Sequence, residues 1–144
     1  MTSSVSSISE RIMLAIEALL QGVPQVAGIW REREEPPSRD ECPCLILGCD
    51  VESNSAGTVP VVDCRLKIFV DICVSGRPLA ALADPIRVEI NQLLMASPRT
   101  LGGLAWDIVP DGTEWDRAVG EIGIARLRYE VKFRHQRDDI TAAI

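Results

Sequence analysis

The sequence predicts an α+β domain in which a mainly antiparallel sheet of about five strands carries two helices on one face. Two segments place apolar residues at helical spacing, and five others have the pattern of strands, in the order α-β-β-β-α-β-β. Short turns join the consecutive strands, which favours antiparallel pairing. The length of 144 residues predicts one domain over residues 1–144, with flexible ends near 1–7 and 138–144.

The first helix is expected over residues 9–21. Ile12 and Ile16 lie on one stripe with further apolar residues three and four positions apart. Ser9 has the side chain of a helix N-cap, and Pro24 follows the end of the pattern. This helix therefore presents one apolar face to the sheet.

The second helix is expected within residues 79–97. Its apolar stripe consists of Leu79, Leu82, Ile86, Ile90, Leu93 and Leu94. Pro85 interrupts the pattern, and a proline is tolerated in the first turn of a helix, where the backbone donors are unpaired in any case. We therefore expect the regular helix to begin near residues 83–84.

Three strands are expected between the helices. The first begins at Val26 and ends at the charged run after Trp30, the second covers residues 42–53, and the third covers 61–76. A proline-rich polar loop, residues 34–41, separates the first two. The third strand alternates, with Leu66, Ile68, Val70 and Ile72 on one face and Arg65, Lys67, Phe69 and Asp71 on the other.

Two further strands are expected after the second helix. Residues 104–110 form the first, and 111–121 read as a polar turn. The stretch from 124 to 139 alternates almost without error. Its apolar face carries Leu127, Tyr129, Val131 and Phe133, and its charged face carries Arg126, Arg128, Glu130, Lys132 and Arg134. The charged face has three candidate roles, namely contact with water, with nucleic acid or with another subunit.

The charge balance bears on these roles. The net charge is −6 and the sequence pI is about 4.8, which argues against a dedicated DNA- or RNA-binding protein, because such proteins neutralise phosphates with a basic surface. The N-terminal segment lacks the pattern of a signal peptide, and no apolar run reaches the length of a membrane span. We therefore expect a cytoplasmic protein without membrane contact.

The five cysteines allow two interpretations. Cys42, Cys44 and Cys49 lie close together, followed by Cys64 and Cys73. A thiolate metal site is one reading, although the spacing is C-x-C and the chain has a single histidine. The other reading is that reduced thiols pack as small apolar groups, which the odd count favours. We predict no bound metal and no cofactor.

The residue inventory argues against an enzyme. The only histidine, His135, is expected as a solvated residue near the end of the last strand, and no nucleotide-binding or nucleophile motif is present. Asp111, Glu114 and Asp116 have the oxygens to bind a hard cation, but a polar turn between strands explains them better.

Apolar residues on the charged faces favour a subunit contact. Phe69 lies between Lys67 and Asp71, and Trp115 lies in the expected turn. These rings either fill the margin of the core or anchor an interface, where aromatic residues and arginine are enriched. The candidate interface residues are Arg126, Arg128, Glu130, Lys132, Arg134, Phe69, Lys67 and Trp115.

The element order and two segments resemble the tail terminator proteins of long-tailed phages, of the minor tail protein U type of lambda-like phages. The segments are "RTLGGLAWDIVPDGTEWD", residues 99–116, and "LRYEVKFRHQRDDIT", residues 127–141. The resemblance covers roughly residues 8–141. The cysteine-rich strand and the loop at 34–41 depart from the family pattern.

This resemblance implies a structural protein of the virion, assembled in the host cytoplasm and located at the junction of head and tail. It implies a hexameric ring that binds the tail tube protein, stops tube growth and offers a docking surface to a head completion or connector protein. DNA would pass through the lumen without specific binding. Another head-tail connector or tail completion protein is the nearest alternative, followed by a small metal- or ligand-binding domain or a nucleic-acid-binding module.

Overall fold

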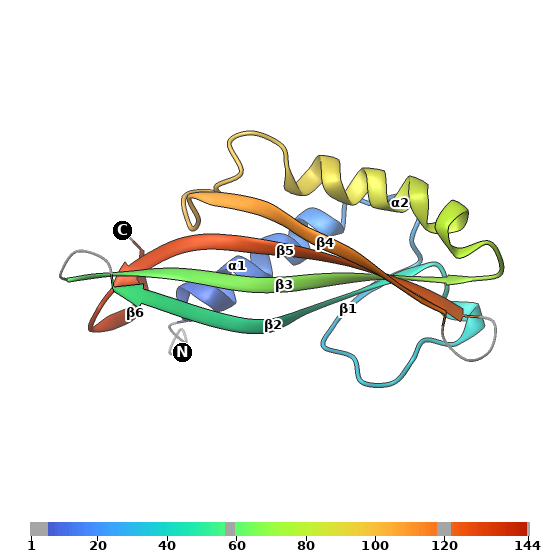
Figure 1. Ribbon diagram of the computed structural model, residues 1–144, viewed down its shortest axis with the longest axis horizontal. Coiled ribbons are helices and arrows are strands. Elements are labelled where there is room, and N and C mark those ends of the chain that lie inside the picture. Colours follow the sequence, from blue (N-terminus) through green and yellow to red (C-terminus); the bar gives the residue numbers. More distant parts are fainter. Residues whose placement is uncertain (1–5, 57–59, 118–121, 144) are drawn as a thin grey trace, which may run out of the picture.

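The computed structural model describes residues 6–56, 60–117 and 122–143, and it confirms the α+β class with two helices and a six-stranded mixed sheet (Figure 1). The elements are α1 (Ile8–Leu20), β1 (Ile29–Arg31), the short 3-10 helix η1 (Arg39–Glu41), β2 (Cys44–Ala56), β3 (Val61–Ser75), α2 (Leu79–Leu94), β4 (Asp107–Arg117), β5 (Ile122–Gln136) and β6 (Asp139–Ala143). Residues 1–5 and 144 of the expected flexible ends lie outside the described residues.

Long antiparallel pairs make up most of the sheet. The strand order is β1-β2-β3-β5-β4, and β6 pairs with the end of β5. The short strand β1 is an exception to the expected antiparallel arrangement, because it runs parallel to β2. The connection over residues 32–43 is long enough for the crossover that a parallel pair needs.

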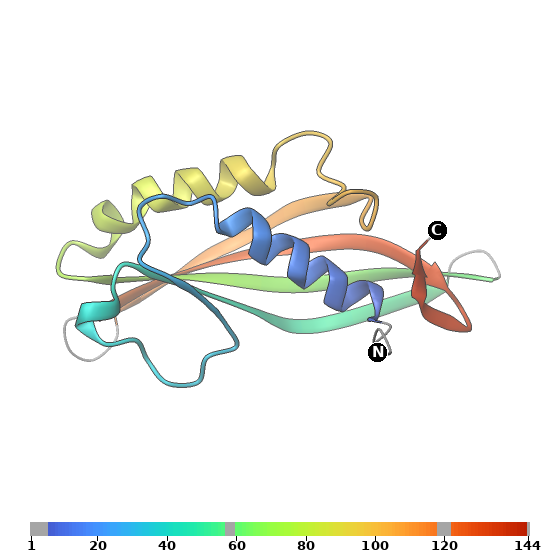
Figure 2. The ribbon, with the colours of Figure 1, turned by 180° about the vertical axis from the view of Figure 1, so that it is seen from behind.

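Both helices cover the same face of the sheet, and Figure 2 shows α1 crossing it. The expected apolar faces of β3 and β5 are buried there as predicted. From α1 the core receives Ile8, Ile12, Ile16 and Leu20, and from α2 it receives Ala83, Ile86, Ile90 and Leu94. No helix within the described ranges combines the length and the apolar character needed to cross a membrane.

Each helix begins earlier than expected. Ser7, and not Ser9, caps α1, and its hydroxyl accepts a hydrogen bond from the backbone N–H of Glu10 at 3.1 Å. Helix α2 begins at Leu79 and includes Pro85, so the expected start near residues 83–84 is wrong. A proline at this point leaves the carbonyl of Ala81 without its helical donor, and Ala81 is exposed, so water can satisfy that carbonyl.

Two segments expected as irregular are strands. Strand β4 continues through Asp111 to Arg117, where the sequence predicts a turn, because the register shifts between Pro110 and Thr113. Gly112 lies in this bulge with a φ of 98°, a conformation that glycine adopts without strain. The predicted flexible end after residue 138 contains β6, whose Thr141 carbonyl accepts a hydrogen bond from Arg11 of α1.

Candidate interface on the open face of the sheet

The face of the sheet without helices, called the open face below, carries most of the predicted interface residues. Arg126, Arg128, Glu130, Lys132 and Arg134 of β5 lie beside Lys67 and Phe69 of β3, because the antiparallel register pairs Asp71 with Arg126 and Asp63 with Arg134. Directly opposed residues point to the same face. The alternation of the sequence thus places seven of the eight candidates on one surface.

Arg126 forms the most buried ion pair of this surface. Its Nε and Nη2 donate to the two carboxylate oxygens of Asp71 at 2.7 and 2.9 Å, and Asp71 is only 5% exposed. The hydrogen bonds from Arg126 to Asp71 raise the pKa of the guanidinium. The guanidinium also lies 3.9 Å from the centroid of the Phe69 ring. Arg126 therefore has partners on both sides within its own chain.

The other arginines of β5 are also paired within the chain. Arg128 donates to Glu114 of β4 at 3.0 Å and also contacts Asp50 of β2. Arg134 donates to Asp63 of β3 at 2.6 Å. A contact with another subunit, which the resemblance to tail terminators implies, would instead place the carboxylates on a neighbouring chain. The carboxylates come from the same chain, namely from Asp50, Asp63 and Asp71 of its first half and from Glu114 of β4.

The remaining cations are more loosely held. Arg65 lies 3.7 Å from Glu130 and Lys67 lies 4.0 Å from Asp111, and the two cationic side chains are 63% and 46% exposed. Exposed pairs of this kind contribute little to stability, about 0–1 kcal/mol each. Arg65 and Lys67 can therefore pair with acids of a partner surface with little loss of stability in their own subunit.

Trp106 adds an exposed aromatic ring that the list of candidates did not include. It is 50% exposed, with Lys132 Nζ at 5.3 Å and the Arg134 guanidinium at 5.6 Å from the ring. Trp106 lies in the strand expected over residues 104–110, and only the structure shows that its ring is exposed. Half-exposed tryptophan next to arginine is typical of interface centres.

Trp115 does not belong to the open face. It is paired with Ala125, whose side chain is buried on the helix side, and the Arg87 guanidinium of α2 lies 5.6 Å from its ring. The bulge in β4 shifts the register with β5. The residues after the bulge, Trp115 among them, therefore point to the opposite face from the one that an unbroken alternation would give. Trp115 is therefore on the opposite side of the sheet from the other candidates.

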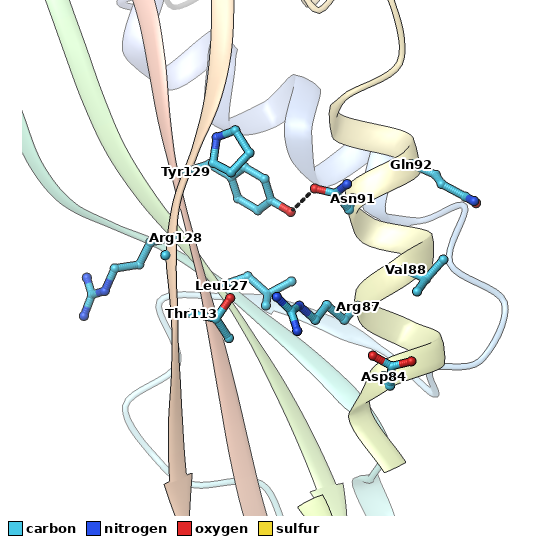
Figure 3. A pocket seen from close by; sticks show the side chains of 11 residues that line it. Asp84, Arg87, Val88, Asn91, Gln92, Thr113, Leu127, Arg128 and Tyr129 are labelled. Carbon is cyan, nitrogen blue, oxygen red and sulfur yellow. Dashed lines mark hydrogen bonds between the residues drawn. The ribbon is translucent and has the colours of Figure 1, made fainter. Parts of the chain in front are cut away.

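A groove of about 490 Å³ lies between α2 and strands β4 and β5 (Figure 3). The hydroxyl of Tyr129 donates to Asn91 Oδ1 at 3.2 Å, and burial raises the pKa of Tyr129 to about 12. The lining contains no cysteine, histidine or serine among the described residues.

His135 and the cysteines were the remaining sequence candidates. His135 is 6% exposed and lies beside the Phe133 ring, so the expectation of a solvated residue is wrong, because β5 continues past it on the buried side. All five cysteines are free. No cluster of three or more metal-ligating side chains is present over residues 6–56, 60–117 and 122–143.

The comparison with solved structures shows a likeness in fold. A chain from the virion of a native gene transfer agent particle shares this fold, with a TM-score of 0.52 and 8% sequence identity over 88% of this chain and 90% of that chain. No family model matches the sequence, and no curated protein matches it. At this identity the likeness shows a shared fold over nearly the full length of both chains.

Proposed function

We propose that this chain is a structural subunit of a virion, and within that class a tail terminator that forms a ring on the head-proximal end of a tail tube. The observation that carries the proposal is the shared fold with a virion chain over 88% of this chain and 90% of the other. The resemblance of residues 99–116 and 127–141 to tail terminators supports the finer role.

A ring requires two different patches on each subunit, joined by a rotation that closes. The open face is our candidate for one of them. It is an extended strand surface with an exposed tryptophan and with cations that lie in weak, exposed pairs. Charges arranged in this way fix the register of a contact more than they add affinity.

The same surface is a poor match for DNA. Arg126, Arg128 and Arg134 already contact carboxylates of their own chain, and the chain carries a net charge of −6. Binding to DNA would require these acids to be displaced or brought close to phosphates. This favours the role of a ring through which DNA passes without specific binding, and it disfavours the nucleic-acid-binding module.

The mass of the purified chain in solution tests ring formation. We expect a hexamer whose share of the protein increases with concentration, because weak contacts complete a ring only above a threshold concentration. Analytical ultracentrifugation over a hundredfold concentration range resolves this species from the 15.8 kDa monomer. A ring of a different order would favour another head-tail connector. A chain that is monomeric over the whole range and also in the presence of a tube protein would contradict the proposal.

A further inference from the structure

A second, smaller apolar cluster lies on the open face at the end of the sheet where β2 begins. It consists of the buried residues Cys44, Ile46 and Cys73, with Trp30, Cys42, Ile122 and Ile124 packed around them. Three of the five cysteines are therefore gathered at one place, and the proposed assembly role does not use them. The chemistry of neighbouring thiols is the property that sets this cluster apart.

Cys44 and Cys73 are directly opposed in the antiparallel pair of β2 and β3. Opposed residues in such a pair have Cα atoms about 4.5–5.5 Å apart, and natural disulfides bridge Cα atoms about 4.4–6.8 Å apart. Both side chains point to the open face and are fully buried. The backbone of the sheet thus already has the separation that a cross-strand disulfide needs.

Cys44 is the middle member of the three thiols. Cys44 faces Cys73 across the strand pair, and Cys42, two residues before it, packs against the same cluster while its S–H donates to the carbonyl of Ser38 at 3.5 Å. Hydrogen bonding with Cys73 lowers the pKa of the Cys44 thiol, whereas burial raises the pKa of Cys42 to about 11, so exchange begins from the small thiolate fraction of Cys42. Cys42 is the only one of the three that is partly exposed.

We propose that Cys44 and Cys73 are a reversible oxidation site, closed into a cross-strand disulfide by a low-molecular-weight disulfide, with Cys42 as the thiol through which the reagent enters. The Cys42 thiolate attacks the reagent, forms a mixed disulfide and releases one thiolate. The Cys44 thiolate then attacks the Cys42 sulfur and releases the second. Finally Cys73 attacks Cys44, and Cys42 leaves as a thiolate and regains a proton. Two protein thiols are oxidised, and one reagent disulfide is reduced to two thiols.

The sheet explains why the Cys42–Cys44 disulfide is replaced by a Cys44–Cys73 disulfide in the last step. Cys42 and Cys44 are separated by only one residue and precede or begin the strand, whereas Cys44 and Cys73 are held opposite each other by the sheet. The sheet therefore favours the Cys44–Cys73 product. Because this link joins β2 to β3 across a long segment of chain, it constrains the unfolded state, and the oxidised protein is expected to melt at a higher temperature than the reduced protein.

Incubation of the full chain with glutathione disulfide, followed by alkylation of free thiols and peptide mass spectrometry without reduction, tests the proposal. We expect the peptides of Cys44 and Cys73 to be linked, and Cys42 and Cys64 to be alkylated. In Cys73→Ala the reaction is expected to stop at a Cys42–Cys44 disulfide. In Cys42→Ala the rate of Cys44–Cys73 formation is expected to fall at least about tenfold, because the remaining sulfurs are buried.

Cys64→Ala is the matched control, because Cys64 is a buried thiol of the same strand β3 that lies outside the cluster. It is expected to form the Cys44–Cys73 link at the wild-type rate. If Cys44 and Cys73 stay reduced in the folded wild-type protein while the exposed Cys49 becomes glutathionylated, the oxidation site is refuted. Oxidation of Cys42→Ala at the wild-type rate would overturn the entry role. Neither result bears on ring formation, which is measured separately.

Discussion

Replacing Lys67 and Arg134 together by glutamate is expected to raise the concentration at which rings form by at least about tenfold. Both side chains lie on the open face and are about half exposed, at 46% and 49%. Like charges placed across an interface cost several kcal/mol, and 1.4 kcal/mol corresponds to a factor of about ten. Sedimentation over the concentration series used for the wild-type protein measures the shift.

The choice of these two positions avoids damage to the fold. Their partners, Asp111 and Asp63, are exposed, so losing each ion pair costs at most about 1 kcal/mol. Arg126 would be a poor choice, because a carboxylate there would meet the buried Asp71.

Two arginines in turns outside the open face provide a control for the change in net charge. Arg77→Glu with Arg137→Glu makes the same change in net charge at exposed residues outside the open face. We expect this control to assemble as the wild-type protein does. Equal assembly of both double variants would remove the open face from the interface.

Replacing Gly48 by alanine is expected to lower the free energy of unfolding by about 2–3 kcal/mol. Gly48 is opposed to Phe69, and a Cβ there would lie 2.4 Å from Cζ and 2.8 Å from Cε2 of the ring. The ring is held in place by the Arg126 guanidinium, 3.9 Å from its centroid, so it cannot move without disturbing the pair of Arg126 with Asp71. Urea denaturation measures the loss.

Two further variants separate the clash from the general effect of replacing glycine. At Gly28 an added Cβ meets Trp30 at 3.5 Å, an ordinary contact, so Gly28→Ala is expected to be nearly neutral or slightly stabilising. In the background of Phe69→Ala, Gly48→Ala is expected to cost little, because the ring is gone. A cost for Gly48→Ala that is the same with and without the ring would show that Phe69 is not its cause.

The alternation of the sequence was sufficient to predict the two central strands and their faces. In β3 and β5 the apolar residues repeat every second position, and a face of this kind is set by local geometry alone. The charged surface was therefore found from sequence. Alternation does not determine the register between the strands. The register decides that Arg126 meets Asp71 and that Arg134 meets Asp63.

The wrong expectations for β4 come from its register. Asp111 and Gly112 are turn-forming residues, and the structure uses them in a bulge that continues β4 instead of ending it. That bulge also puts Trp115 on the helix side. The sequence did not predict β6, because five residues at the end of the chain carry too little pattern to separate a strand from an irregular tail.

The length of tail tubes grown in the presence of this chain tests the central claim most directly. A candidate tail tube protein is polymerised with and without the purified chain, and tube lengths and ends are recorded by negative-stain electron microscopy. We expect shorter tubes with a ring at one end only, and a return to long, uncapped tubes with Lys67→Glu and Arg134→Glu combined. Tubes of unchanged length without rings, at chain concentrations well above that of tube ends, would contradict it.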